Sequence, residues 1–335
     1  NKQKATDVYG RPDRSRPKSR GYDAGLFIQD EYAINPYLTL TPVLRWSYYN
    51  RKPTTDNNDK FGLASRSDSK VTPGITLTLS PSKQLSFYAS VQTGYRPPFL
   101  DELYTSIEYP EFGMYSVVLP NPDLKPEESI NVEIGVNGDY KSLFSDSDRF
   151  VFHANVFRDR VKNLINAGAT GDMDFTDDGD MILYYSIDNV GKALKTGFEA
   201  SADYYPGNAD FHLSYGYLHA EDKNTGEKIP GLTPMQATLR AGYTYKPWNV
   251  NGWYRMRLFK GGKSNLETAW NSGEYKQLGG FATHTLGLTW KPQIKDWADF
   301  TLTFSVDNIT NKKFRYLNGG YGVGRSYRAW LSATF

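Results

Sequence analysis

The chain contains no cysteine and no long apolar run. Without cysteine it has no disulfide framework, no thiolate nucleophile and no cysteine-ligated metal centre. A transmembrane helix needs about 18 or more consecutive apolar residues, and the sequence contains no such run. The formal net charge of +2 is too near balance to indicate a nucleic-acid partner. These absences exclude helical membrane proteins, disulfide-rich secreted domains and strongly basic nucleic-acid-binding proteins.

The last eleven residues, 325–335, show what the sequence has instead. Every second residue is apolar or small, namely Phe335, Ala333, Leu331, Ala329 and Tyr327. The residues between them are mostly polar, and such alternation predicts a β-strand with one apolar face. Its length fits the roughly 9–11 residues of a tilted transmembrane strand. Taken alone, the segment also fits an edge strand of a soluble β-sandwich.

The same alternation predicts thirteen strands along the chain. They cover residues 23–34, 37–50, 70–80, 84–96, 128–140, 149–164, 192–205, 209–220, 234–246, 250–260, 281–291, 299–309 and 325–335. Short turns (35–36, 81–83, 142–148, 206–208, 247–249 and 292–298) alternate with long loops (51–68, 97–126, 166–190, 221–233, 261–280 and 310–324). This alternation is typical of outer-membrane barrels, as is the aromatic content of 15%. The sequence therefore predicts an all-β fold, a transmembrane antiparallel β-barrel.

The strand count and the histidines limit what this barrel is expected to do. Because closed bacterial barrels have an even number of strands, the odd count predicts further strands before residue 1. The four histidines, His153, His212, His219 and His284, lack metal-ligand spacing, and His153 and His212 are predicted to face the barrel interior. No Gly-x-Ser-x-Gly elbow occurs. We therefore predict that the protein is not an enzyme.

The long loop 97–126 is the segment most suited to ligand capture. Prolines stiffen both of its ends, and between them lie tyrosines and carboxylates. A long loop with rigid roots and aromatic residues is typical of a binding loop rather than a solvated connection. The candidate ligand-binding residues are Arg96, Tyr104, Glu108, Tyr109 and Tyr115.

Several motifs in the chain resemble those of TonB-dependent outer-membrane receptors of the haem, hemophore or siderophore type. The segment Arg96-Pro97-Pro98-Phe99 resembles the FRAP box of that family, and 121–127 (NPDLKPE) resembles its NPNL box. The matching positions are Arg96, Pro97, Pro98, Asn121, Pro122 and Leu124. Residues 308–314 and 324–327 resemble the family's last hairpin and the start of its final strand. A terminal aromatic residue, here Phe335, serves as an assembly signal in such barrels.

The resemblance implies a receptor in the bacterial outer membrane that imports an iron complex. The family fold is a barrel of 22 strands with an N-terminal plug. Residues 1–335 are then expected to be the C-terminal portion, with about thirteen strands, and the plug and first strands precede it. The implied partners are the TonB complex (through that N-terminal part), outer-membrane lipid and lipopolysaccharide, and a hemophore or host haem protein, but no nucleic acid.

The ligand and the class of barrel leave alternatives open. The paired boxes slightly favour haem over a ferric siderophore, although no histidine lies between them. A tyrosinate can replace histidine as an axial haem ligand, so Tyr104, Tyr109 and Tyr115 are the candidates. No covalent cofactor is expected. A passive porin-like channel and a barrel that serves as an adhesin or protein-binding platform are the alternative functions.

Two charged segments are weaker candidates for binding. The acidic loop holds Asp172, Asp174 and Asp178, whose alternate spacing around glycines resembles a calcium loop, although no bidentate glutamate follows at the twelfth position. The basic residues in 11–20 are candidates for contact with lipopolysaccharide phosphates. Each segment also fits a solvated loop.

Overall fold

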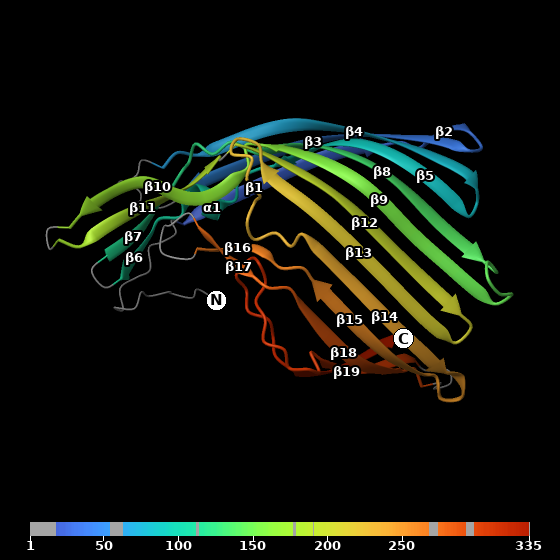
Figure 1. Cartoon of the computed structure of the whole chain (residues 1–335). Helices are drawn as coiled ribbons and strands as arrows, with labels where there is room; N and C mark the ends of the chain where they lie inside the picture. Colours follow the sequence, from blue (N-terminus) through green and yellow to red (C-terminus); the bar gives the residue numbers. More distant parts are fainter. Residues whose placement is uncertain are drawn as a thin grey trace.

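The computed structural model describes residues 18–53, 63–111, 114–176, 179–189, 191–267, 274–292 and 298–334. They form one large, curved antiparallel sheet with smaller sheets at one end (Figure 1). The sheet follows the chain from β1 to β20, and each wall strand pairs with the next wall strand in the sequence. Its strands are β1 (Ser19–Gln29), β2 (Tyr32–Asn35), β3 (Leu38–Pro53), β4 (Arg66–Ser82), β5 (Leu85–Arg96), β8 (Glu127–Lys141), β9 (Asp148–Lys162), β12 (Lys192–Pro206), β13 (Ala209–Asp222), β14 (Met235–Tyr245), β15 (Val250–Phe259), β18 (Phe281–Trp290), β19 (Asp299–Asp307) and β20 (Ser326–Thr334).

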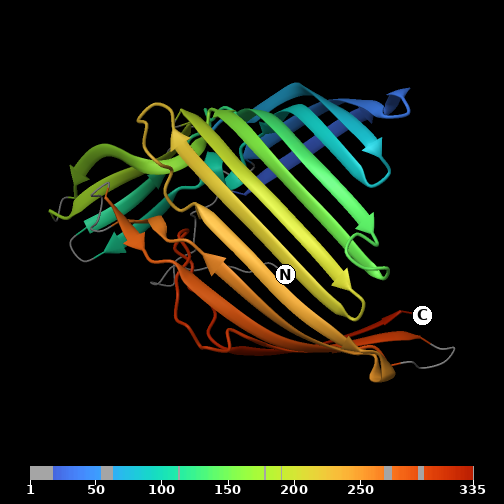
Figure 2. The same cartoon turned by 45° about the vertical axis from the view of Figure 1, so that its right-hand side comes forward.

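This wall confirms the thirteen predicted strands. The short β2 pairs with the same strand, β3, as β1 does, so β1 and β2 count as one wall strand, and the path through the described residues has thirteen members. Figure 2 shows the sheet bent into an open trough, as expected for part of a barrel wall. Within the described residues, β1 and β20 are its two edges. The expectation of 22 strands stays a prediction.

The two faces of the wall differ in polarity, as the alternation predicts. One face carries exposed apolar side chains such as Ile134, Val156 and Leu286, each more than half exposed. The opposite face carries hydrogen-bonded polar groups; for example, the hydroxyl oxygens of Thr76 and Ser90 lie 3.0 Å apart. A continuous apolar face is unfavourable in water but stable against hydrocarbon, so it faces lipid and the polar face lines the interior.

The connections sort by length, also as predicted. The short turns lie at one end of the wall and the long loops at the other (Figure 1). The long loops, however, hold regular structure that the sequence pattern did not predict. They contain α1 (Leu100–Tyr104), β6 (Ile107–Glu111), β7 (Met114–Leu119), β10 (Ile165–Phe175), β11 (Met181–Asn189), β16 (Gly262–Glu267) and β17 (Tyr275–Leu278), and one short turn holds the 3₁₀ helix η1 (Lys246–Trp248). In the part of the chain that the structure describes, no helix is long and apolar enough to cross a membrane.

Candidate functional site

Arg96, the first residue of the FRAP-like motif, forms an ion-pair network at the base of loop 97–126, which we call the Arg96 network. Arg96 donates two hydrogen bonds to Glu127, at 2.8 and 2.6 Å, and two to Glu102, both at 3.0 Å. Glu102 also accepts a 2.8 Å bond from the backbone N–H of Phe99, which caps the first turn of α1. Since two carboxylates already compensate the Arg96 charge, this geometry favours a role in positioning the loop over direct ligand contact.

Next to the Arg96 network, side chains of α1 pack in a small apolar core. Leu103, Tyr104 and Leu124 are each at most 1% exposed. The Tyr104 hydroxyl lies 3.0 Å from the carbonyl oxygen of Arg51 and 2.9 Å from that of Ala64. Burial raises the pKa of Tyr104 to about 12, so the phenol stays protonated at neutral pH. A tyrosine that ligates haem iron must be accessible and ionised, so this placement favours a structural role for Tyr104.

The second family box fastens this loop to the other long loop. The Asn121 amide donates to the carbonyl of Ile187 at 3.0 Å and to the carboxylate of Asp188 at 2.6 Å. The Asn189 side chain accepts from the backbone N–H of Lys125 at 2.8 Å and donates to its carbonyl at 2.9 Å. Hydrogen bonds from side-chain amides therefore hold residues 121–125 of the first loop to residues 187–189 of the second.

The two loops then share one four-stranded sheet, in the order β10-β11-β7-β6, which we call the loop sheet. Its central pair is parallel and joins β7 of the first loop to β11 of the second, from Met114 opposite Met181 to Leu119 opposite Ser186. Figure 1 shows it projecting beyond the long-loop end of the wall. The two longest loops thus form a single platform.

The loop sheet brings together some of the predicted ligand-binding residues. Tyr115 is a partly exposed residue of β7, and its register partner on β6 is Pro110, next to Tyr109. Glu108 and Tyr109 lie in β6, but their side chains are outside the described residues, as is Phe335. Tyr104 and Arg96 lie in the root of the loop and not in the sheet. The five candidates therefore do not form one cluster in the described structure.

The predicted calcium site finds no support. Asp172 and Asp174 are exposed on β10, and Asp178 lies outside the described residues. Among the side chains that the structure places, no three histidines or carboxylates gather in a geometry that suits a metal ion. The basic residues at 11–17 are also outside the described ranges, whereas Lys18 and Arg20 are exposed at the start of the wall.

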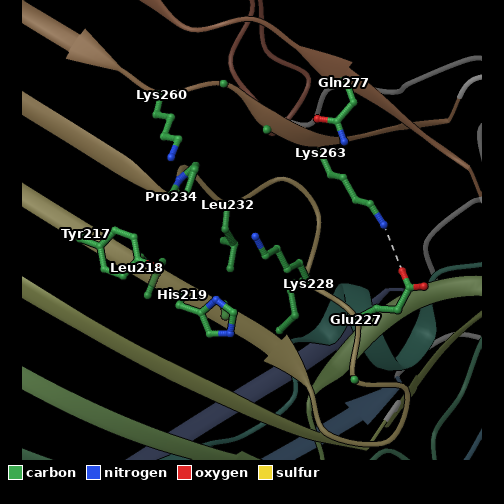
Figure 3. Close-up of a pocket in the computed structure, with 15 residues that line it drawn as sticks. Tyr217, Leu218, His219, Glu227, Lys228, Leu232, Pro234, Lys260, Lys263 and Gln277 are labelled. Carbon is green, nitrogen blue, oxygen red and sulfur yellow. Dashed lines mark hydrogen bonds and ion pairs between the residues drawn. The ribbon is translucent and has the colours of Figure 1, made fainter.

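A groove of about 500 Å³ lies in the rim at the long-loop end, and we call it the rim groove. It lies between the loop that follows β13 and the residues that follow β15 (Figure 3). Lys228, Lys260 and Lys263 line it, and Lys263 pairs with Glu227 at 3.1 Å. Sequence reasoning missed this site because its cations come from two separate loops, neither of which is basic by itself.

A second cavity of about 450 Å³ lies on the polar face of the wall and includes His153, Arg257 and Phe259. The His153 ring stacks on Tyr88, and its Nδ1 lies 2.7 Å from the side-chain oxygen of Asn137. Phe259 stacks on Phe281 with ring centroids 4.7 Å apart. This part of the interior wall therefore combines aromatic rings with an exposed cation. It also confirms the prediction that His153 faces inward.

Comparison with known proteins gives consistent matches. A family model described as "TonB dependent receptor-like, beta-barrel" matches residues 2–309. The chain is 24% identical to the Heme/hemopexin utilization protein C of Haemophilus influenzae (strain 86-028NP), over 83% of this chain and 38% of that protein. It is 27% identical to the Hemoglobin and hemoglobin-haptoglobin-binding protein A of Haemophilus influenzae, over 71% of this chain and 22% of that protein.

Solved structures show the same fold. A mutant of the ferric enterobactin receptor PfeA from Pseudomonas aeruginosa, in complex with enterobactin, superposes with a TM-score of 0.68 at 21% identity. The match covers 94% of this chain and 46% of the receptor, and the chain likewise spans less than half the length of both curated relatives. The family consists of receptors and transporters built on outer-membrane β-barrels, not of enzymes. From the sorted loops, the lipid-facing wall and this match, we conclude that the chain belongs to the TonB-dependent receptor family, as its β-barrel part.

Proposed function

We propose that this chain is the C-terminal barrel portion of a TonB-dependent receptor that imports an iron complex, with haem preferred over a ferric siderophore. The observation that carries this proposal is the family match along the wall, combined with two relatives whose names refer to heme or hemoglobin. The solved siderophore receptor shares the fold only, so it does not favour either ligand. In this proposal a plug domain and further strands precede residue 1 and make the contact with the TonB complex.

The rim groove supports an anionic ligand. Among the residues that the structure describes, Lys228 and Lys260 have no ion-pair partner, so both charges are available at the mouth of the barrel. Haem presents two carboxylates, and lysine binds such groups as a flexible point charge. Tyr217 and Leu232 add apolar surface to the same groove. The groove thus offers the mixture of charge and apolar contact that an amphipathic iron complex requires.

Tyr115 is the proposed iron ligand that the described structure leaves accessible, while Tyr109 remains a proposal for which no side chain is described. Arg96 is proposed to act by holding α1 and the loop root in place, since Glu102 and Glu127 already occupy its donors. A phenolate on the loop sheet is positioned at the mouth of the barrel, where an arriving ligand first meets the receptor (Figure 1).

A host haem protein or hemophore is the proposed protein partner, and the loop sheet is its proposed contact surface. Met173 and Phe175 project from β10 and are both 62% exposed. Apolar side chains of this size, exposed far from the lipid-facing wall, are typical of a protein interface. The assignment is consistent with one relative named for heme/hemopexin utilization and another named for hemoglobin and hemoglobin-haptoglobin binding.

The test is a titration of the full-length receptor with haemin and with a panel of ferric siderophores. Haemin is expected to bind with a Soret shift that the Tyr115→Phe variant changes, and Lys228→Gln with Lys260→Gln is expected to weaken binding. The Tyr104→Phe variant should keep the Soret spectrum of the wild type. Binding of a siderophore but not haemin would refute the haem preference, and binding of neither, with passive solute flux, would favour a porin-like channel.

A further inference from the structure

Three of the five methionines in the chain lie on one face of the loop sheet. Met181 of β11 is the direct register partner of Met114 on β7, and directly paired residues project from the same face of a sheet. Met173 on β10 is opposite Leu183, two residues beyond Met181, so it belongs to that face as well. We call Met114, Met173 and Met181 the methionine face.

The spacing of these positions allows the three thioethers to approach one point. Neighbouring strands lie about 4.8 Å apart, so Met114 and Met181 stand next to each other. Met173 is a diagonal neighbour of Met181, and diagonal neighbours lie roughly 7–8 Å apart, within reach of long side chains. Methionine is unbranched and flexible, so it can adjust the position of its sulfur. Met114 and Met181 are partly exposed and Met173 is 62% exposed, so all three are accessible from solvent.

Carboxylates flank these methionines in the chain and make their surroundings negative. Asp172 and Asp174 stand on either side of Met173, and Asp180 directly precedes Met181. Asp172 and Asp174 are exposed, and within the described ranges of the chain none of the three carboxylates forms an ion pair. Uncompensated negative charge raises the local concentration of cations. The acidic loop therefore attracts a cation to a surface whose available ligand atoms are sulfurs.

We propose that the methionine face binds a soft monovalent metal ion, Cu(I), through the thioether sulfurs of Met114, Met173 and Met181. Thioethers select Cu(I), whereas calcium and magnesium prefer oxygen ligands. The chain has no cysteine that would compete for such an ion. Tyr115, the proposed iron ligand, directly follows Met114 in β7 and so projects from the opposite face of the loop sheet. The site therefore does not depend on which iron complex the receptor carries.

The test is a titration of the full-length receptor in detergent with Ag(I), a redox-inert ion of the same charge and softness, in chloride-free buffer. Calorimetry is expected to show one more equivalent bound by the wild type than by the triple variant Met114→Leu with Met173→Leu and Met181→Leu. Each single variant is expected to lower the affinity of this site on the order of tenfold or more, because even changes outside the ligand shell alter metal affinity by about 10–100-fold. Competition with a chromophoric Cu(I) chelator, with ascorbate present, measures Cu(I) itself.

Leucine is the chosen replacement because it nearly keeps the volume of methionine and removes the sulfur, so the packing of the loop sheet is preserved. The charges of the acidic loop are tested separately. Asp172→Asn with Asp174→Asn should weaken Ag(I) binding at low ionic strength and have little effect in concentrated sodium nitrate, because salt screens exposed charges.

The matched control is Met256→Leu. Met256 is also a partly exposed methionine, but it lies in the wall strand β15, outside the loop sheet. This variant should bind Ag(I) as the wild type does, and all variants should show native strand content by circular dichroism. Equal Ag(I) binding by the triple variant and the wild type, an equal loss in Met256→Leu, or displacement of the bound Ag(I) by excess Ca(II) would overturn the proposal.

Discussion

Replacement of Arg96 by glutamine should release the loop root without unfolding the wall. The side chains of Glu127 and Glu102 are only 16% and 21% exposed, and Arg96 itself is 33% exposed. Removing one partner of a fully buried ion pair costs about 3–5 kcal/mol, because the remaining charge stays desolvated. Discounted for this partial exposure, we expect a loss of about 2–3 kcal/mol in the stability of the loop root. The opening equilibrium should then rise roughly 30-fold to 150-fold, since each 1.4 kcal/mol is a factor of ten.

Hydrogen exchange measured by mass spectrometry on peptides that cover 97–106 tests this expectation. The amides of Leu103 and Thr105 bond within α1, to Phe99 and Asp101, so their exchange reports directly on its opening. The control is Arg149→Gln. Arg149 binds Asp139 with the same paired geometry, but the two side chains are 50% and 46% exposed.

Solvent screens an exposed ion pair, so this control should leave hydrogen exchange in 97–106 unchanged and have at most a small effect, confined to the short turns. Two results would contradict the idea that the buried ion pairs of the Arg96 network stabilise the loop. One is unchanged hydrogen exchange in 97–106 in the Arg96 variant, and the other is an equal effect of both variants on their own regions.

Three further predictions follow from the same structure. The pKa of Tyr104 is raised from 10.0 to about 12, so its contribution to loop stability should be lost as the pH rises through this interval, because the opened loop releases the phenolic proton at the lower pH. The difference in tyrosinate absorbance between the wild type and Tyr104→Phe, followed against pH, measures the ionisation of this residue. The Asn189→Ala variant removes bonds to Lys125 and should cost about 2–3 kcal/mol, so that limited proteolysis cuts both long loops; cleavage in one loop alone would contradict the coupling. The Gly287→Val variant should lower the thermal stability of the wall by about 1–3 kcal/mol, because a Cβ at this position would lie 2.1 Å from the Trp253 ring; an unchanged melting temperature would show that this ring moves freely.

The wall could be predicted from the sequence because the alternation of polar and apolar residues that determines it lies within each strand. Residues that alternate in polarity fix which side chains face lipid, and a one-residue slip would expose the whole polar set to hydrocarbon. The prolines also located the end of β5, just before Pro97, and the start of β8, just after Pro126, since proline cannot donate to the hydrogen-bond ladder of a sheet. Thirteen wall strands were predicted and thirteen are present in the described ranges, and this agreement follows from the short-range constraint.

The loops could not be predicted in the same way, because their order depends on contacts between distant segments. β7 pairs with β11, about 67 residues further along the chain. The sequence of neither strand indicates that the other is its pairing partner. Asn121 and Asn189 look like ordinary turn residues in the sequence, yet in the fold their amides hold the two loops together.

Tyr104 shows the same division most clearly. The sequence established a tyrosine on a stiff loop near the mouth of a barrel, and from that position an iron ligand was a reasonable expectation. Only the tertiary structure placed Leu103 and Leu124 around it and two backbone carbonyls at its hydroxyl. Alternation along a strand decides whether a side chain meets lipid or water, whereas burial in a loop depends on which remote segments fold over it, and no local pattern encodes that.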